Sequence, residues 1–239
     1  MTQMPPLALL AGGLATRLRP LTEKIPKSLL TVAGEPFLAH QLRLFRREGI
    51  HRVVLCVGHL WEQISDFAGD GSRFGLELHY SADGERLMGT GGALKKALPL
   101  LGHEFLVCYG DSYLDIGYQP VVEAFRQSQK LGLMTVFRNE GSWDTSNVEF
   151  DGKSVLSYSK RDHSPGMAHI DWGLGAFRST AFHGWPSDTP FDLADVYTQL
   201  VARGELAAFE VSTRFYEIGS TNGIRDADVY IARQRRFEE

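Results

Sequence analysis

The sequence predicts an α/β protein whose sheet is doubly wound and mostly parallel, with helices on both faces. Short, continuously apolar runs, typical of strands buried on both sides, alternate along the first half of the chain with longer amphipathic segments. Strands that alternate with helices form right-handed crossovers, and such crossovers place the strands parallel to one another. This arrangement is that of a Rossmann-like sheet, to which the less regular second half of the chain adds a small lobe.

The expected elements of the first half follow one another in order. Strands are expected at Leu7–Leu10, Val53–Val57, Leu76–Tyr80 and Phe105–Cys108. Helices are expected between them at Pro36–Glu48, Leu60–Phe67 and Gly92–Leu100. In the first of these helices the apolar residues recur at helical spacing, and a glycine at position 49 ends it.

The second half is expected to mix strands and helices less regularly. Helices are predicted at Pro120–Leu131, at Asp192–Arg203 and from Thr221 onward. Strands are predicted at Leu133–Phe137 and Leu174–Phe177, with a hairpin formed by Asn147–Phe150 and Val155–Ser159 around an Asp-Gly turn. Because no linker or internal repeat interrupts the chain, we expect a single domain over residues 1–239.

Composition limits the classes of function. The net charge of −4 over 239 residues argues against a general attraction to nucleic acid or to an anionic membrane. The two cysteines lie inside apolar runs and are expected to be buried, reduced thiols. No apolar stretch is long enough to span a membrane and the N-terminus lacks a signal-peptide pattern, so a cytoplasmic location is expected. The sequence leaves open whether the chain forms a homo-oligomer.

The first expected strand runs into a glycine-rich loop that carries basic residues. Gly12 and Gly13 follow Leu10 and Ala11, and glycines after a strand let backbone N–H groups approach an anion closely. Arg17 can bind a phosphate group through two N–H donors, and Lys27 adds a compact positive charge nearby. The glycines alone also fit a plain turn with solvated basic residues. A P-loop is excluded because Thr16-Arg17 stands where Gly-Lys-Ser/Thr is required, and the dinucleotide fingerprint lacks its spaced glycines.

The full string from Ala11 to Leu42 resembles the N-terminal signature of the sugar-1-phosphate nucleotidylyltransferases. The family form is A-G-G-x-G-T-R-L-x-P followed by P-K-x-L-x-P-V, and this chain differs at Ala15, where glycine is usual, and at Thr31, where proline is usual. The resemblance implies that the loop wraps a triphosphate and that Arg17 and Lys27 are catalytic through their charges. It also implies a nucleotide-binding half near residues 1–135, and a sugar-binding half with a C-terminal helix over 136–239.

Three further segments resemble the family's nucleotide and metal signatures. The Gly89–Ala93 string resembles a second glycine loop that approaches the nucleoside, although alone it fits a flexible helix entry equally well. Asp111, after the strand at Phe105–Cys108, resembles the aspartate that holds Mg²⁺; a turn or helix-cap aspartate is the alternative. Glu217 stands where a second acidic metal ligand is usual. The implied nucleotide-binding set is Leu10, Ala11, Gly12, Gly13, Thr16, Arg17, Gly89, Thr90, Gly91, Gly92 and Asp111.

The second half contains segments that resemble the family's sugar site. Ser157–Lys160 resembles F-x-E-K, so that Lys160 aligns with a lysine that contacts the sugar phosphate, and Ser159 replaces a glutamate. Ile170–Leu174 resembles N-x-G-I/L, with aspartate for asparagine. These departures concern the sugar's identity rather than the chemistry. The implied sugar-phosphate-binding residues are Asn147, Glu149, Lys160, Asp171 and Gly173.

These segments together predict joining of a nucleoside triphosphate to a sugar 1-phosphate, with Mg²⁺ as cofactor and pyrophosphate as by-product. A nicotinamide dehydrogenase lacks support because no acidic residue follows a dinucleotide fingerprint. A non-catalytic nucleotide-sensing subunit is the other alternative, but it would have lost Arg17, Lys27 or Asp111. The Leu87–Ala93 string favours GTP with a heptose or mannose 1-phosphate. A uridylyltransferase for an amino-sugar 1-phosphate of the N-acetylmuramate type stays open beside it.

Overall fold

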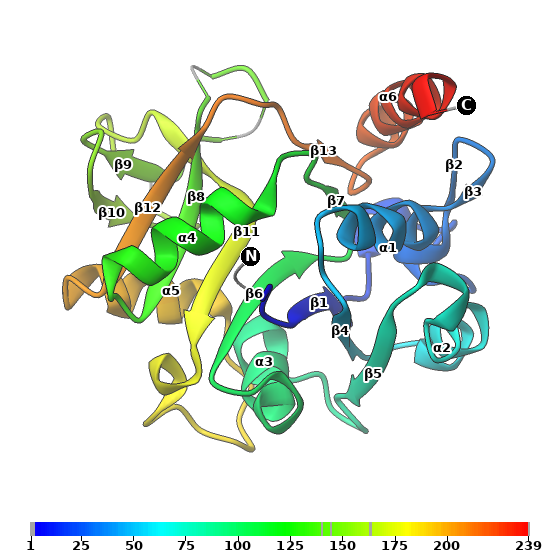
Figure 1. The fold of residues 1–239 in the computed structure, drawn as a ribbon, viewed down its shortest axis with the longest axis horizontal. Coiled ribbons are helices and arrows are strands. Elements are labelled where there is room, and N and C mark those ends of the chain that lie inside the picture. Colours follow the sequence, from blue (N-terminus) through cyan, green and yellow to red (C-terminus); the bar gives the residue numbers. More distant parts are fainter. Residues whose placement is uncertain (1–2, 140, 144, 163, 239) are drawn as a thin grey trace.

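The computed structural model describes residues 3–139, 141–143, 145–162 and 164–238, with backbone alone for 236–238, and it confirms the α/β fold class (Figure 1). Its described strands form one nine-stranded sheet and two short ribbons. In the described part of the chain, no helix combines the length and the apolar character that crossing a membrane would require.

Four parallel strands form the first half of the sheet, in the order β6, β1, β4, β5. They are β1 (Leu7–Ala11), β4 (Arg52–Val57), β5 (Glu77–Ala82) and β6 (Glu104–Tyr109). Because all four run in the same direction, their carboxyl ends lie along one edge of the sheet. Ligands of open α/β sheets bind at this edge.

The second half extends the same sheet beyond β6 with strands of both directions. The long strand β11 (His169–Arg178) pairs antiparallel with β6 and with β8 (Gly132–Arg138). The hairpin of β9 (Val148–Phe150) and β10 (Val155–Tyr158) forms as the Asp-Gly turn predicts. The strand β12 (Leu206–Val211), which the sequence analysis does not anticipate, pairs parallel with β8.

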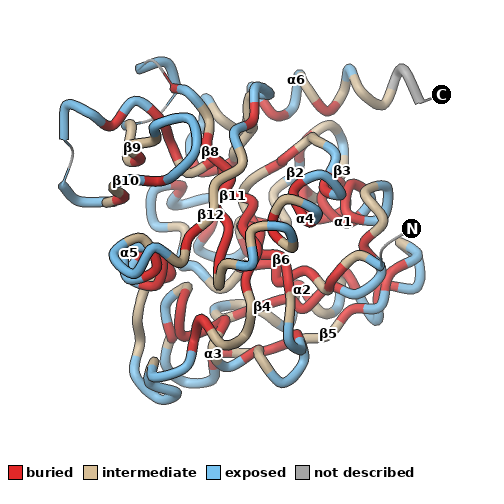
Figure 2. The backbone as a smooth tube through the Cα atoms, turned by 60° about the vertical axis from the view of Figure 1, so that its left-hand side comes forward, coloured by how far each residue is buried: buried red, intermediate tan, exposed pale blue. Residues whose placement is uncertain are grey.

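Helices cover both faces of the sheet, as expected. The helices α1 (Phe37–Arg47), α2 (Trp61–Ala68) and α4 (Tyr118–Ser128) pack on one face, and α3 (Gly89–Leu101) and α5 (Leu193–Ala202) on the other. Successive residues of β1 alternate between these layers: Leu7 and Leu9 face the first group, and Ala8 and Leu10 the second. Figure 2 shows the buried residues concentrated in the sheet and on the inner sides of the helices.

Short elements complete the fold beside α1. The ribbon of β2 (Thr31–Val32) and β3 (Glu35–Pro36), and that of β7 (Ser112–Tyr113) and β13 (Tyr216–Glu217), lie near the C-terminal helix α6 (Thr221–Glu238). A small apolar cluster joins them, with Val32, Phe37, Ile218 and Ile231 among its buried members. This packing brings the start of α6 next to the segment that follows β6. The described residues also contain four 3-10 turns: Thr16–Leu18, Lys27–Leu29, Ser72–Phe74 and Ser179–Phe182.

Candidate active site

Glycines and carboxylates follow the four parallel strands at their common edge. Gly12 follows β1 and Gly58 follows β4, and their backbones lie against each other: a methyl group added at Gly58 would lie 2.7 Å from the carbonyl oxygen of Gly12. Asp83 directly follows β5, and Asp111 follows β6 after a single glycine. The backbone of Gly12 therefore runs close to β4 and leaves the space above the strand ends open.

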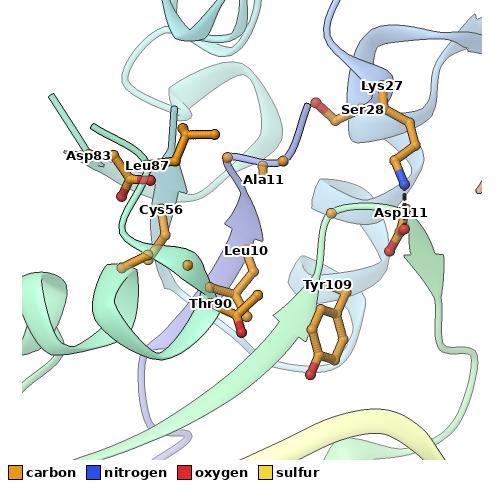
Figure 3. Close-up of a pocket in the computed structure, with 15 residues that line it drawn as sticks. Leu10, Ala11, Lys27, Ser28, Cys56, Asp83, Leu87, Thr90, Tyr109 and Asp111 are labelled. Atoms are coloured by element: carbon orange, nitrogen blue, oxygen red, sulfur yellow. Dashed lines mark hydrogen bonds and ion pairs between the residues drawn. The ribbon is translucent and has the colours of Figure 1, made fainter. Parts of the chain in front are cut away.

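A first cavity of about 250 Å³ lies above these strand ends (Figure 3). Figure 3 places Asp83 and Lys27 on opposite sides of it, with the loop after β1 between them. Its apolar walls include Leu10, Leu87 and Ala93. The residues that line it are Leu10, Ala11, Gly12, Gly13, Lys27, Ser28, Cys56, Asp83, Leu87, Gly89, Thr90, Ala93, Tyr109, Gly110 and Asp111.

Lys27 and Asp111, which the sequence predicts as site residues, form an ion pair in the wall of this cavity. The Lys27 Nζ lies 2.6 Å from the Asp111 Oδ2, and the two side chains are 21% and 32% exposed. Lys27 begins the 3-10 turn Lys27–Leu29, and Pro26, which is extended, precedes it. A partly desolvated cation and a carboxylate therefore lie side by side in the wall of this cavity.

A second cavity of about 340 Å³ adjoins the first, and Tyr109 and Asp111 line both. Arg17 lines this second cavity rather than the first, and Thr16 is not among the described residues that line either. Arg17 and Asp111 thus border the same second cavity. The lining residues are Arg17, Tyr109, Asp111, Ser112, Trp143, Asn147, Ile170, Asp171, Trp172, Gly173, Phe215, Glu217, Gly219 and Ser220.

Glu217 reaches Asp111 through the ribbon of β7 and β13 and not through the edge of the central sheet. Glu217 pairs with Ser112, and the Ile218 N–H donates to the Asp111 carbonyl oxygen at 2.9 Å. A methyl group added at Gly219 would lie 2.5 Å from the Glu217 Oε2 and 3.9 Å from the Asp111 Oδ2. The two carboxylates are therefore no farther apart than the sum of these distances. Glu217 also accepts hydrogen bonds from the Gly219 N–H and the Ser220 hydroxyl.

The second glycine loop is the first turn of α3, because the helix begins at Gly89, three residues before the predicted start. Gly89 and Thr90 line the first cavity, whereas the N–H groups of Gly91 and Gly92 point to the Phe191 carbonyl oxygen, at 3.0 and 3.3 Å. A methyl group at Gly91 would lie 2.4 Å from the Phe191 ring. These two glycines therefore allow α3 to pack closely against the segment before α5.

Asp83 places a second carboxylate in the first cavity. Its side chain is 9% exposed; the Oδ2 accepts from the Met88 N–H at 3.0 Å, and the buried Oδ1 has no partner among the described residues. Burial raises the pKa of this carboxyl group above its ordinary value. An unpaired buried carboxylate oxygen is costly, and a ligand N–H group entering the cavity can satisfy it.

Three of the five predicted sugar-phosphate residues line the second cavity. The Asn147 Oδ1 accepts from the Asp171 N–H at 3.0 Å, and the Asp171 Oδ1 accepts from the Gly173 N–H at 3.0 Å. Glu149 points instead toward Gly166, where an added methyl group would lie 2.7 Å from its Oε1. Lys160 forms an ion pair with Asp192 at 3.1 Å. Glu149 and Lys160 are not among the described residues that line the second cavity.

We predict that Asp171→Asn stabilises the protein at pH 8 but not at pH 4. Desolvation raises the pKa of Asp171 to about 6 from 3.8, so the ionised side chain progressively destabilises the folded state as the pH rises from about 4 to 6. Asparagine keeps an oxygen for the Gly173 N–H without the charge. The gain in the free energy of unfolding is at most about 3 kcal/mol, and solvent access to the partly exposed side chain reduces it. Urea unfolding of both proteins at pH 4 and pH 8 measures this gain. An equal gain at the two pH values would contradict the raised pKa of Asp171.

The sequence does not indicate several residues of the site. Ser28, Asp83 and Gly58 border the first cavity or its loop, and Trp143 lines the second. The Trp143 side chain is 48% exposed, and the guanidinium carbon of Arg214 lies 3.6 Å from its ring centroid. Ala15, where the family signature has glycine, has φ of 47°, the left-handed conformation that glycine adopts without strain.

Comparisons with known proteins place the chain in a family. Residues 8–147 match the family model described as nucleotidyl transferase. The N-acetylmuramate alpha-1-phosphate uridylyltransferase of Neisseria meningitidis is 40% identical over 92% of this chain and 95% of its own length. The UTP–glucose-1-phosphate uridylyltransferase of Synechocystis is 28% identical over 82% of this chain, which spans only 55% of that relative. The chain therefore belongs to the nucleotidyl transferase family, among proteins named as sugar-1-phosphate nucleotidyltransferases.

The fold is shared with solved structures of this kind. A Bacillus anthracis protein described as a glucose-1-phosphate thymidylyltransferase superposes with a TM-score of 0.84 over 96% of this chain and 95% of that one. The sequence identity is 21%, so this likeness concerns the fold alone.

Proposed function

We propose that the chain transfers a nucleotidyl group from a nucleoside triphosphate to a sugar 1-phosphate and releases pyrophosphate. The observation that carries this proposal is that the two cavities meet at Tyr109 and Asp111, with Lys27 at the junction. One cavity for each substrate, joined at a cation and a carboxylate, suits a reaction between two phosphate groups. We place the protein in the cytoplasm, where both substrates are made.

The nucleoside triphosphate binds in the first cavity. Its base lies toward Asp83 and its phosphates lie along the backbone of Gly12 and Gly13, toward Lys27. An oxygen of the sugar phosphate attacks the α-phosphorus from the side of the second cavity, and the bond to pyrophosphate breaks. This oxygen is already anionic at neutral pH, so no general base is needed. Lys27 and Arg17 offset negative charge that develops on the transferred group and on pyrophosphate.

The carboxylates of Asp111 and Glu217 fit a magnesium ion. Mg²⁺ prefers oxygen ligands and is held in nucleotide sites by one or two carboxylates together with substrate phosphates and waters. No group of three or more His, Cys, Asp or Glu side chains close enough for an all-protein metal site occurs among the described residues. The convergence of two carboxylates supports this substrate-dependent kind of site. The ion, when bound, supplies electrostatic stabilisation of the phosphate oxygens.

The sugar binds in the second cavity, against Asn147, Asp171 and Gly173. Lys160 approaches the sugar phosphate while it stays paired with Asp192, because an ammonium group has three N–H donors and the ion pair occupies one of them. Glu149 is the weakest of the predicted contacts, since its carboxylate faces Gly166.

For the substrates we propose UTP and an amino-sugar 1-phosphate of the N-acetylmuramate type. The Neisseria relative supports this choice, because its match extends over nearly all of both chains. Uracil offers one N–H donor to the Asp83 carboxylate. GTP with a heptose or mannose 1-phosphate is the second candidate: the Leu87–Ala93 string resembles the guanylyl branch, and guanine offers two N–H donors.

A panel of UTP, GTP, CTP and dTTP, each combined with several sugar 1-phosphates, tests the proposal by pyrophosphate release. The panel includes N-acetylmuramic acid, N-acetylglucosamine, mannose and heptose 1-phosphates. We expect UTP with an amino sugar to give a kcat/KM at least about tenfold above any GTP pair, which corresponds to about 1.4 kcal/mol in transition-state binding. Faster turnover with GTP would favour the second candidate, and turnover with no pair would refute the transferase proposal itself.

A further inference from the structure

Lys160, the predicted sugar-phosphate contact, is held by a carboxylate that the sequence analysis assigns no role. Its Nζ lies 3.1 Å from the Asp192 Oδ1, and the two side chains are 40% and 48% exposed. Lys160 lies in the loop after β10, where a long side chain has many rotamers. An ion pair to a fixed partner limits these rotamers.

Asp192 is a fixed partner because it caps helix α5. Its side chain accepts from the Ala194 N–H at 2.9 Å, and the Asp195 carboxylate accepts from the Asp192 N–H at 3.2 Å, which completes a capping box. The Asp192 Oδ1 also accepts from the Thr90 hydroxyl at 3.0 Å. Three donors thus converge on this one oxygen, and its position is set by two helices.

The same oxygen connects Lys160 with the wall of the first cavity. Thr90 lines that cavity, and its hydroxyl oxygen accepts from the Leu193 N–H at 2.8 Å. The hydrogen bonds of Gly91 and Gly92 to the Phe191 carbonyl oxygen attach the same two segments. The position of Lys160, the lysine expected at the sugar phosphate, is therefore fixed relative to helix α3, which borders the nucleotide.

On the basis of the proposed function, we propose that Asp192 is a positioning residue that holds Lys160 at the entrance for the sugar phosphate. It keeps the ammonium group beside the oxygen that also binds the Thr90 hydroxyl in the wall of the first cavity, and the remaining N–H donors of Lys160 bind the sugar phosphate. Asp192 itself touches neither substrate. Its effect is therefore expected on the capture of the sugar phosphate and not on the binding of the nucleotide.

Asp192→Asn tests this role without removing the helix cap, because asparagine is an equally good capping residue and still accepts from Ala194 and Thr90. We expect the KM for the sugar 1-phosphate to rise about twofold to fivefold, as for loss of a partly exposed ion pair. The KM for the triphosphate and the thermal midpoint should change little. Asp195→Asn is the matched control, because it removes the same charge from the same capping box without touching Lys160.

A double-mutant cycle with Lys160→Met separates positioning from a structural effect. If Asp192 acts through Lys160, adding Asp192→Asn to Lys160→Met leaves the KM for the sugar 1-phosphate unchanged. The inference would be overturned if the two substitutions raised the KM for the sugar 1-phosphate independently, so that their effects multiply in the double variant, or if Asp192→Asn raised the KM for the triphosphate equally. It would also be overturned if Lys160→Met raised the KM for the sugar 1-phosphate and Asp192→Asn left it unchanged. Absence of turnover in the unmodified protein with every substrate pair would instead refute the proposed function on which the inference rests.

Discussion

Replacement of Lys27 by alanine is expected to lower kcat by about 10²–10³-fold, the usual cost of losing one preorganised charged contact to a transition state. The reason is its position: Lys27 lies at the junction of the two cavities and contacts the Asp111 carboxylate at 2.6 Å. The same ion pair adds little to folding, because partly exposed pairs contribute at most about 1 kcal/mol. Pyrophosphate release at saturating substrates measures the first quantity, and urea unfolding the second.

Lys24→Ala is the control for this substitution. Lys24 belongs to the same loop, but it is exposed and is not among the described residues that line either cavity. Its removal changes the net charge equally and should leave kcat within about twofold. If Lys27→Ala keeps a normal unfolding curve and also turns over at the wild-type rate, Lys27 has no part in the reaction.

The sequence predicts those parts of the site that are contiguous in the chain. The loop from Ala11 to Lys27 is an ordered motif that follows an apolar run, and both signals are local. The same holds for Asp111, which closely follows a run whose burial is evident from its composition. The structure accordingly places Gly12, Gly13, Lys27 and Asp111 around one cavity.

The sequence does not identify Asp83 as a site residue, because the strand predicted before it ends two residues too early. The predicted strand stops at Tyr80, whereas the alternation of apolar and polar residues continues through Ser81 and Ala82, and β5 extends to Ala82. Its pairing with β4 extends the strand, since Ala82 lies opposite Val57. With the end at Ala82, Asp83 follows its strand directly, the position that marks a ligand-binding side chain in a parallel sheet.

The contacts of Lys160 and Glu217 could not be predicted because they join distant parts of the chain. Asp192 lies 32 residues from Lys160 and 102 from Thr90, and no local pattern connects these three. Glu217 reaches Asp111 through a two-residue ribbon, too short for any periodicity to indicate. This ribbon, which the packing of α6 holds in place, is what brings the two carboxylates to the same cavity.

Asp111→Asn is expected to reduce turnover at saturating Mg²⁺ by about 10³-fold or more, because it removes a charged metal ligand and the partner of Lys27 while keeping the side chain's shape. Nucleotide binding should partly survive, since the glycine loop and Asp83 are untouched. Glu217→Asp should cost less, although the shorter side chain gives up its bonds to Gly219 and Ser220. Asp115→Asn is the matched control.

The Asp115 carboxylate binds Arg47 and Tyr230 away from both cavities, so its loss should lower the thermal midpoint without changing the requirement for Mg²⁺. Titration of Mg²⁺ in the presence of a non-hydrolysable triphosphate, followed by calorimetry, distinguishes a lost ligand from a general weakening. Both Asp111→Asn and Glu217→Asp should shift the midpoint for Mg²⁺ upward, the first because it removes a charged oxygen ligand and the second because the shorter side chain moves its carboxylate away from the ion. The opposite result is a Mg²⁺ midpoint that shifts in Asp111→Asn and stays constant in both Glu217→Asp and Glu217→Gln. That result would show that Glu217 is not a metal ligand and that its role is limited to its hydrogen bonds at the start of α6. The ion would then be bound by Asp111 and the phosphates alone.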